Sequence, residues 1–362
     1  MTMTFDSGGP APVKRPRIDP ERLRGVSRSA AKVTETLGLG WLAPFFLIGA
    51  GEPVGQELSK LWERLAVPLI ALGLFVAAWA WAAPTVQTSL GAVPGPAQVA
   101  EQAGALWADH VAEREKAVAF YERQEARNAQ ILAQDPDADV RIRAYTGRPT
   151  YLDQIVTSLQ TVFAGFLLAS LIAIPLGIAC GLSRTVQAAL NPIIQILKPV
   201  SPLAWLPIVT MVVSALYVSE NPIVAKSFVN SAITVTLCSL WPTLINTAVG
   251  VASIDKDLLN VGRVLRLSTA TKIRRVVLPS ALPYIFTGLR LSLGVGWMVL
   301  IAAEMLAQNP GLGKFVWDEF QNGSSASLAR IMVAVLTIGF IGFLLDRLMY
   351  ALQAIIAPQT DR

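Results

Sequence analysis

The chain has 362 residues, of which 53% are hydrophobic and only 15% are charged, and its mean hydropathy is +0.50. This composition excludes an ordinary soluble enzyme and indicates an integral membrane protein. The net charge of +5 does not indicate a nucleic-acid partner, because the basic residues lie in loops and in the tail rather than on a patch interleaved with aromatic residues.

The residues needed for catalysis or cofactor binding are missing from the sequence. Cys180 and Cys238 each lie inside an apolar run, which predicts free thiols rather than a disulfide. The single histidine, His110, has no cysteine or histidine near it, so we expect no metal site. Gly313-Lys314 lacks the rest of a phosphate-binding loop. We therefore expect no catalytic residues, no ATP site and no cofactor in this chain.

Residues 1–64 begin polar and rich in proline and arginine, which predicts a cytosolic N-terminal tail. Within this tail the apolar run Leu37 to Gly51 is shorter than the roughly 20 residues needed to cross a bilayer. A helix lying at the membrane interface is the favoured interpretation, and a span is the alternative. Residues 65–84 form the first predicted span, in which the run Leu65 to Ala83 ends at Pro84.

Residues 85–153 contain a strongly charged segment, Glu101 to Leu132, which predicts a solvated helix. The ten acidic and seven basic residues of this loop lack the positive bias of cytoplasmic loops, so we place it outside the membrane. One apolar stripe follows helical spacing, and we expect it to pack against the rest of the loop; it consists of Trp107, Val111, Val118 and Tyr121. The alternative is that the insertion helps to seat a soluble partner.

The core, residues 154–353, is predicted to hold five further spans, followed by a cytosolic tail at 354–362. Gly177 and Gly181 place small residues one turn apart, which predicts close approach of two helices. Arg184 and Lys198 are expected to flank a short cytoplasmic turn. The predicted spans are Tyr151 to Ser183, Leu203 to Val218, Ser227 to Ala248, Leu291 to Ala307 and Leu328 to Tyr350.

The third span of the chain, Leu203 to Val218, is entered through Pro199, Pro202 and Pro207, which break a regular helix. Irregular backbone at membrane depth persists only where it is buried in protein or lines a cavity. The fourth span is rich in hydroxyl groups, which serve either interhelical hydrogen bonds or a polar path. Glu304 lies near the outer end of the fifth span and needs a partner or water, because an acid inside a membrane is costly.

The stretch from Asp255 to Leu291 carries seven Lys or Arg residues against two acids, which indicates a cytosolic loop. Its residues 255–279 resemble the coupling loop of ABC importer permeases, which begins Glu-Ala-Ala, continues to a glycine and closes on Leu-Pro. The matching positions here are Asn260, Val261 and Gly262 for the start, Arg266 for the glycine, and Leu278-Pro279 for the end.

Three further stretches resemble the nitrate/sulfonate/bicarbonate group of these permeases, and most closely its nitrate branch. They are Lys198 to Pro207, Tyr284 to Arg290, and Ala302 to Met305 followed by Gly311-Leu312-Gly313. The resemblance covers the chain from about Leu65 to Gln353. It implies an all-α integral membrane protein with six transmembrane helices and the type I ABC importer permease fold, here with a charged extracytoplasmic helical insertion between the first two spans.

The resemblance also implies the protein's partners and location. We expect a multi-pass protein of the bacterial inner membrane with both termini in the cytosol, contacting lipid. Its expected partners are a second permease copy, two ATP-binding subunits that bind ATP and Mg, and a periplasmic or lipid-anchored substrate-binding protein. A heterodimer of permeases is the alternative. The residues expected to couple the chain to the ATPase are Asn260, Val261, Gly262, Arg263, Arg266, Leu278 and Pro279.

The substrate implied by the resemblance is nitrate, with nitrite accepted beside it. Sulfonate or taurine, bicarbonate and cyanate are the alternatives, and a stand-alone channel or secondary carrier is the other class considered. No Lys or Arg is expected in the middle of a span, so hydroxyl, amide and indole groups would pass the anion along. The candidate pathway residues are Ser201, Trp205, Thr210, Asn230, Thr234, Trp297 and Glu304.

Overall fold

The structure is a computed structural model that describes residues 25–357, except 28–30, 32–33, 35–39, 41, 50, 52, 89–90 and 219–223, and without the side chains of Lys256, Leu259, Arg263 and Ser325. The chain forms two compact units, Met1–Gly73 and Leu74–Arg362. Most of the predicted N-terminal tail, part of the predicted interfacial run and most of the C-terminal tail lie outside the described residues.

The first unit consists of short helices that lead into the first span. They are α2 (Ala43–Gly49), α3 (Val54–Leu61), the π-helical turn η1 (Trp62–Ala66) and the beginning of α4 (Val67–Ala82). The helical segment Val54–Thr85 is long and apolar enough to cross a membrane, so the span predicted at 65–84 extends further toward the N-terminus. None of the residues of α4 is buried by the chain, as expected for a helix that is apolar all round and surrounded by lipid.

The second unit begins with the end of α4, a short 3-10 turn, a two-residue hairpin and the long helix of the insertion. Their bounds are η2 (Ala83–Thr85), β1 (Gln87–Thr88), β2 (Gly91–Ala92) and α5 (Pro96–Gln134). Helix α5 confirms the helix predicted over Glu101 to Leu132. It begins at Pro96, which suits the first helical position because proline has no backbone N–H that would lack a partner there. The Gly95 N–H donates to the Gln98 side chain.

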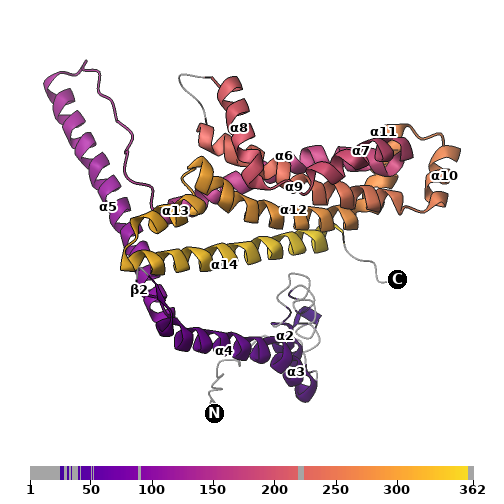
Figure 1. The fold of residues 1–362 in the computed structure, drawn as a ribbon, viewed down its shortest axis with the longest axis horizontal. Coiled ribbons are helices and arrows are strands. Elements are labelled where there is room, and N and C mark those ends of the chain that lie inside the picture. Colours follow the sequence, from indigo (N-terminus) through magenta and orange to yellow (C-terminus); the bar gives the residue numbers. More distant parts are fainter. Residues whose placement is uncertain are drawn as a thin grey trace, which may run out of the picture. The chain divides into compact units, whose positions relative to one another are not determined.

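Most of the remaining helices form a bundle in which α9 is central, and α10 lies at one end of it (Figure 1). Helix α9 packs along α6 on one side and α12 on the other. Helices α13 and α14 pack against α12. The bounds are α6 (Tyr151–Leu182), α7 (Arg184–Leu197), α8 (Pro202–Leu216), α9 (Lys226–Ala252), α10 (Lys256–Val264), α11 (Thr269–Lys272), the π-helical turn η3 (Ile273–Val277), α12 (Leu278–Ala307), α13 (Leu312–Asn322) and α14 (Ser325–Ile356).

Glycines allow α6 to lie against α9 with almost no space between the backbones. A Cβ atom on Gly177 would lie 2.6 Å from the Thr247 Cβ, and one on Gly181 would lie 2.5 Å from the Val251 Cβ. Both distances are far below van der Waals contact, so no larger residue fits without moving a helix. The close approach predicted from these two glycines is confirmed.

Five helical segments are long and apolar enough to cross a membrane, and a sixth crossing is available if the bent pair α7 and α8 counts as one. This pair differs from the prediction. Residues 184–197 form a helix rather than a short turn, and α8 turns away from α7 by 102° at the proline-rich stretch. Pro199 and Pro202 explain the break, because proline cannot donate the backbone hydrogen bonds that would continue α7.

The fifth predicted span also differs, because helical structure runs from Thr269 to Ala307 and includes the second half of the predicted coupling loop. Arg290 therefore lies inside α12, so the expectation that no Lys or Arg lies in the middle of a span is wrong. The sequence-based assignment extended the basic loop to Leu291, although only uncharged residues separate Arg275 from Arg290. Its charge is matched by Asp346 of α14, whose Oδ2 accepts from the Arg290 Nη2 at 2.7 Å.

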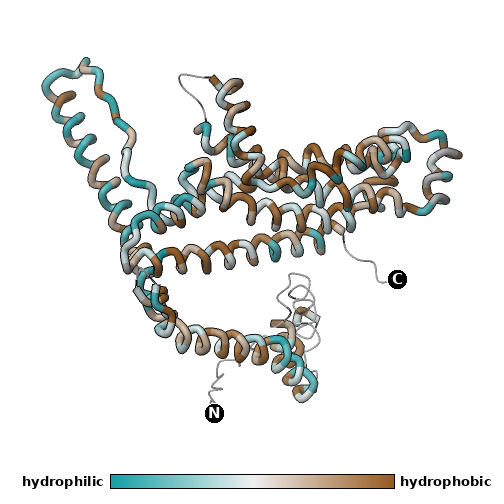
Figure 2. Tube along the Cα trace, in the orientation of Figure 1, coloured by the Kyte–Doolittle hydropathy of each residue, from teal (hydrophilic) through white to brown (hydrophobic). Residues whose placement is uncertain are grey.

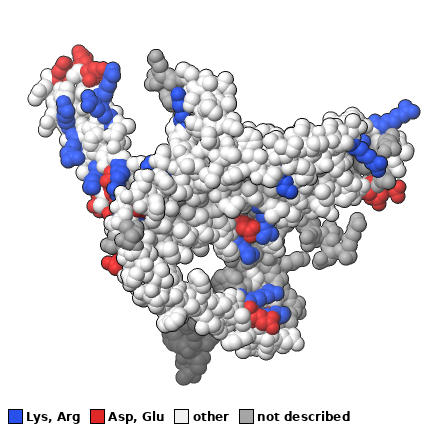
Figure 3. All heavy atoms as spheres, in the orientation of Figure 1, with Lys and Arg blue, Asp and Glu red and all other residues white. Residues whose placement is uncertain are grey.

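Hydropathy divides this second unit into apolar and polar parts (Figure 2). The bundle helices are mainly apolar, whereas α5 and the region of α10 carry many hydrophilic residues. On the face drawn in Figure 3, charged atoms gather over α5 and around α10, and the middle of the bundle carries few. This distribution matches a bundle that spans the membrane with charged segments at its two ends.

Candidate functional site

The proline-rich end of α8 carries three of the predicted pathway residues. Ser201 is exposed and caps α8, with its Oγ accepting from the Leu203 N–H at 3.3 Å. Trp205 is half-buried, and its indole Nε1 has no hydrogen-bond partner among the described residues. Thr210 lies half-buried one and a half turns further along. The indole N–H is therefore a donor that remains available.

Helix α9 carries Asn230 and Thr234, and both side chains are buried. The Thr234 hydroxyl donates to the Asn230 carbonyl at 2.8 Å, whereas the Asn230 Oδ1 has no partner among the described residues. Other hydroxyl groups of this helix hold the bundle together. Thr236 donates to the Gly165 carbonyl of α6 at 3.1 Å, and Thr243 donates to Ser292 of α12 at 2.7 Å. The polar residues of α9 thus serve mainly interhelical contacts, with a few groups left unpaired.

Trp297 and Glu304 join helices, as their contacts show. The Trp297 indole donates to the Ile338 carbonyl at 2.9 Å, which ties α12 to α14. Glu304 is completely buried, and both of its carboxylate oxygens lie 2.9 Å from the Ser158 hydroxyl of α6. The prediction that Glu304 needs a partner is therefore met by Ser158 of the same chain.

Glu304 also fixes the start of α13. Its Oε2 accepts from the Gly313 N–H at 3.0 Å, and the Ser158 hydroxyl accepts from the Leu312 N–H at 2.9 Å. A carboxylate is favoured at this place, because the first N–H groups of a helix lack partners within the helix. A Cβ atom on Gly311 would collide with the carboxylate. The acid and the Gly-Leu-Gly stretch noted in the sequence thus form one structural unit.

Sequence reasoning missed a cavity of about 370 Å³ at the junction of α7 and α8. Lys198 at the end of α7 lines it, together with Trp241 and Asn246 of α9 and Val295 of α12. Lys198 was noted only as a residue flanking a turn, and the spacing of α9 gave no sign that Trp241 faces it. The one available signal was a lysine next to three prolines inside apolar sequence.

A second cavity, of about 500 Å³, lies beside α12 and α14 and was also missed. It is lined by Arg290, Asp346, Thr287, Gly294 and Met298, among others. The Arg290 guanidinium binds the Asp346 carboxylate through Nε and Nη2, and it also lies 5.7 Å from the centre of the Tyr350 ring. Both charged side chains are 39% exposed. A charged pair at this depth needs cover from water or protein.

The predicted coupling segment forms the separate short helix α10, which exposes apolar side chains. Leu258, Val261 and Val264 are 50%, 55% and 83% exposed. Of the other predicted coupling residues, Asn260 and Pro279 are exposed and Leu278 is half-buried. Gly262 is buried next to Lys272. The Arg263 side chain is not among those that the structure describes. An apolar patch on a polar segment is typical of a surface that binds a protein.

Arg266 ends this helix in a left-handed conformation, with φ of 48°. Glycine is favoured in such a conformation because it has no Cβ atom. The coupling loop that the sequence resembles is expected to carry a glycine at this position, and here an arginine adopts the conformation that favours glycine. The Leu267 N–H donates to the Gly262 carbonyl at 3.0 Å and closes the turn.

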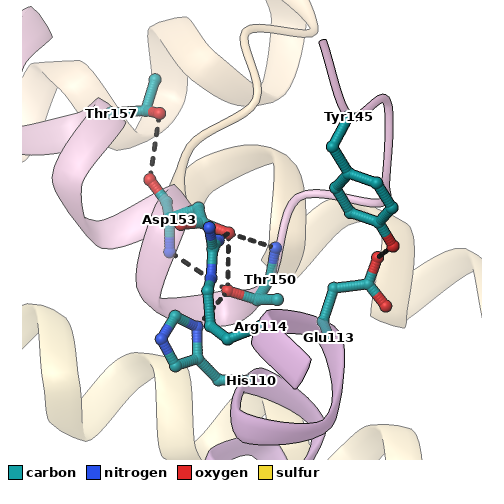
Figure 4. Close-up of polar contacts among 7 residues, drawn as sticks. All are labelled: His110, Glu113, Arg114, Tyr145, Thr150, Asp153 and Thr157. Atoms are coloured by element: carbon teal, nitrogen blue, oxygen red, sulfur yellow. Dashed lines mark hydrogen bonds and ion pairs between the residues drawn. The ribbon is translucent and has the colours of Figure 1, made fainter. Parts of the chain in front are cut away.

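The insertion is fastened to the start of α6 by polar contacts (Figure 4). His110 of α5 lies 2.7 Å from the Thr150 hydroxyl, through its Nδ1, and Arg114 pairs with Asp153. Asp153 also accepts from the Thr150 N–H at 2.9 Å, which forms the N-terminal capping box of α6. The lone histidine thus has a structural partner, and no group of residues suited to a metal ion occurs in the described part of the chain.

The apolar stripe of α5 differs from the prediction. Trp107 is 61% exposed, Val118 is 56% exposed, and Val111 is exposed as well. Tyr121 contacts the returning chain, since its hydroxyl accepts from the Tyr145 N–H at 3.0 Å. The return segment is extended and narrow, so it covers one face of α5 and leaves the rest of the stripe open.

Comparisons with known proteins agree with this architecture. Residues 173–362 match the model of the family described as "Binding-protein-dependent transport system inner membrane component". The chain is 38% identical over 205 residues to the nitrate import permease protein NrtB of Synechococcus elongatus, a match that covers 57% of this chain and 70% of the relative. It is 43% identical over 201 residues to the bicarbonate transport system permease protein CmpB of the same species, covering 55% and 67%.

Among solved structures, the chain is similar to one titled "Inward facing conformations of the MetNI methionine ABC transporter". The TM-score is 0.47 at 15% sequence identity, and the match covers 57% of this chain and 95% of the other.

Proposed function

Because this chain belongs to the family of binding-protein-dependent inner-membrane transport components, we propose that it carries nitrate, with nitrite beside it, through an ABC importer. The family makes it a multi-pass membrane subunit that has no ATPase site of its own and associates with ATP-binding and substrate-binding partners. The observation that carries the substrate proposal is the similarity to nitrate import permeases, at 38% to 40% identity over about 70% of their length.

The polar groups of the bundle support a path for a small anion. The Trp205 indole N–H is a hydrogen-bond donor that has no partner among the described residues. Sites of this kind bind an anion weakly, which suits transport because the ion must leave as readily as it enters. Glu304 and Trp297 act at a distance from the ion in this proposal, since they hold α6, α12, α13 and α14 in position.

We further propose that α10 docks in a groove of an ATP-binding subunit and transmits its closure to the spans. The exposed apolar side chains of α10 support this role, as does the basic charge of the following helix. Two copies of the chain related by a two-fold axis are the simplest assembly. In this proposal the N-terminal tail and α10 lie in the cytosol and α5 lies outside the membrane.

Bicarbonate is the second candidate substrate. The observation in its favour is the identity of 42% to 43% to bicarbonate permeases, slightly above the value for the nitrate permeases. Both ions are small, planar and singly charged, so the same donors would serve both. The choice between them depends on an experiment rather than on the fold.

Growth of a deletion strain tests the substrate. With nitrate as the only nitrogen source at low concentration, loss of the gene should stop growth, and the intact gene should restore it. Parallel cultures limited for inorganic carbon, or supplied with taurine as the only sulfur source, test bicarbonate and sulfonate. Normal growth on low nitrate in a strain without another nitrate transporter would refute the nitrate proposal and leave the importer class in place.

Two substitutions in the complemented strain test the coupling role of α10. Gly262→Trp introduces a bulky side chain at a buried position, and Arg266→Glu reverses an exposed charge. Both should abolish uptake while the protein remains folded in the membrane. Normal uptake by both variants would exclude α10 as the joint with the ATPase.

A further inference from the structure

The cavity between α7, α9 and α12 has the charge and the donors of an anion site. We propose that it binds a small inorganic oxyanion through Lys198, with the Trp241 indole and the Asn246 amide as hydrogen-bond donors. This inference rests on the proposed function and adds a binding site to it. The cavity has a volume of about 370 Å³ and lies where the chain turns by 102° between α7 and α8.

Lys198 is a cation without a counter-charge. It forms no ion pair with any described residue, and none of the residues that line the cavity is acidic. In the second cavity, by contrast, Arg290 is already neutralised by Asp346. The two cavities share Val295 as a lining residue, so they lie next to each other along α12. Lys198 is thus the available positive charge in this region.

The walls of the cavity supply hydrogen-bond donors beside Lys198. Trp241 is only 7% exposed, and its Nε1 has no hydrogen-bond partner in the described part of the chain. The Asn246 Nδ2 uses one hydrogen for the Pro242 carbonyl, at 2.8 Å, and has a second one to offer. The rest of the cavity is lined by Cys238, Pro242, Ile245 and Val295. Lys198 is an exposed residue, so its charge is accessible both to solvent and to an incoming anion.

The size of the cavity indicates a site that the ion passes through. One water molecule takes up about 30 Å³ in the liquid, so the cavity accommodates a small anion together with several waters. A partly hydrated anion held by one lysine leaves readily, as conduction requires. A purely structural role for Lys198 is the competing explanation, because a cation at the end of α7 also stabilises that helix.

Cys238 is a native probe of this cavity. In the assembled transporter carrying Cys180→Ser, it would be labelled with three methanethiosulfonates of similar length, bearing a sulfonate, a trimethylammonium or no charge. We expect the sulfonate reagent to react faster than the ammonium reagent. Lys198→Gln should reduce the ratio of these two labelling rates about tenfold. Arg184→Gln is the matched control, because Arg184 is an exposed cation at the other end of α7. It should leave the ratio unchanged.

Protection of Cys238 from labelling by a bound anion identifies the ligand. Nitrate or bicarbonate should slow the labelling of Cys238 at concentrations at which chloride does not, and Lys198→Gln should abolish this protection. An unchanged charge preference in Lys198→Gln would overturn the proposal. Labelling by the uncharged reagent alone, or by none of the three, would overturn it as well, because the cavity would then be closed to ions.

Transport measurements distinguish an anion-binding role of Lys198 from a purely structural one. In proteoliposomes with the complete transporter, Lys198→Gln should lower nitrate import about tenfold, whereas Lys198→Arg and Arg184→Gln should stay near the wild type. Equal import by Lys198→Gln and Arg184→Gln would count against the site. If the wild-type transporter imports neither nitrate nor bicarbonate, the proposed function fails, and the labelling of Cys238 still decides whether an anion site exists.

Discussion

The bundle around α9 and the insertion of α5 are both helical, but different forces hold them together. In the bundle, glycines bring backbones into contact, and buried hydroxyl groups bond across helices. In the insertion, α5 meets an extended return segment through side chains that bond to its backbone. The Gln124 amide, for example, both donates to the Arg143 carbonyl and accepts from the Arg143 N–H, each at 2.9 Å.

The difference predicts where each region is sensitive to substitution. A buried group that loses its partner has no water to replace it, so a single change in the bundle is costly. A half-exposed contact in the insertion is replaced by water at little cost. We therefore expect large losses of stability from the bundle and small, local ones from the insertion.

The largest effect is expected at Glu304. Glu304→Ala leaves the Ser158 hydroxyl and the Gly313 N–H without their buried acceptor, at about 1–3 kcal/mol for each. Thermal unfolding of the purified transporter in detergent would measure the loss. Glu304→Gln keeps one acceptor oxygen and should cost clearly less. Equal melting temperatures for the alanine variant and the wild type would show that the carboxylate does not hold α13.

The glycines of α6 come next. Gly177→Ala places a Cβ atom 2.6 Å from the Thr247 Cβ and 2.7 Å from the Leu244 carbonyl oxygen, so α6 must move away from α9. Overpacking of this kind costs about 1–3 kcal/mol. Gly339→Ala is the matched control, because a Cβ atom there has no neighbour within 4 Å in α14. It should be neutral or stabilising, and similar losses in both variants would contradict the comparison.

The insertion should respond more weakly. Gln124→Ala removes both bonds to the backbone of Arg143 and should cost about 1 kcal/mol or less, since water can take over these exposed groups. Hydrogen exchange of residues 135–150 in the intact transporter should rise, while that of α9 stays the same. Faster exchange in α9 would mean that the two regions are coupled after all.

The sequence predicts these two regions with unequal success, and the reasons are physical. Hydrophobic length and loop charge located α5 and most of the spans, because both signals are carried by consecutive residues. The course of α7 and α8 was missed, since a proline-rich stretch shows that a helix breaks without showing the direction of the bend. Arg290 was assigned to a loop because its partner, Asp346, is 56 residues away. The cavity at Lys198 depends on three helices that only the fold brings together.

The smallest effect is a pH dependence confined to the insertion. The Tyr145 hydroxyl donates to the Glu113 carboxylate at 2.8 Å, and this bond lowers the pKa of Glu113 below its usual 4.5 and raises the pKa of Tyr145 above its usual 10.0. The lowered pKa of Glu113 means that its stabilisation is present above pH 4.5 and is lost as the pH falls through the folded-state value. The raised pKa of Tyr145 means that its stabilisation is present below pH 10.0 and is lost as the pH rises through the folded-state value.

The link between α5 and the return segment should therefore be constant across the neutral range and should loosen at both extremes. Spin labels on Ala119 and Ala144, two exposed positions on either side of the link, would report the separation of the segments by electron paramagnetic resonance. We expect a narrow distance distribution at pH 7 that broadens in acid and in strong base. Tyr145→Phe removes the hydrogen bond to Glu113. Its distance distribution should be broader at pH 7 and should no longer change with pH, because the bond and the phenol that titrates are both gone. A narrow distribution in this variant would show that the Gln124 contacts alone hold the return segment against α5.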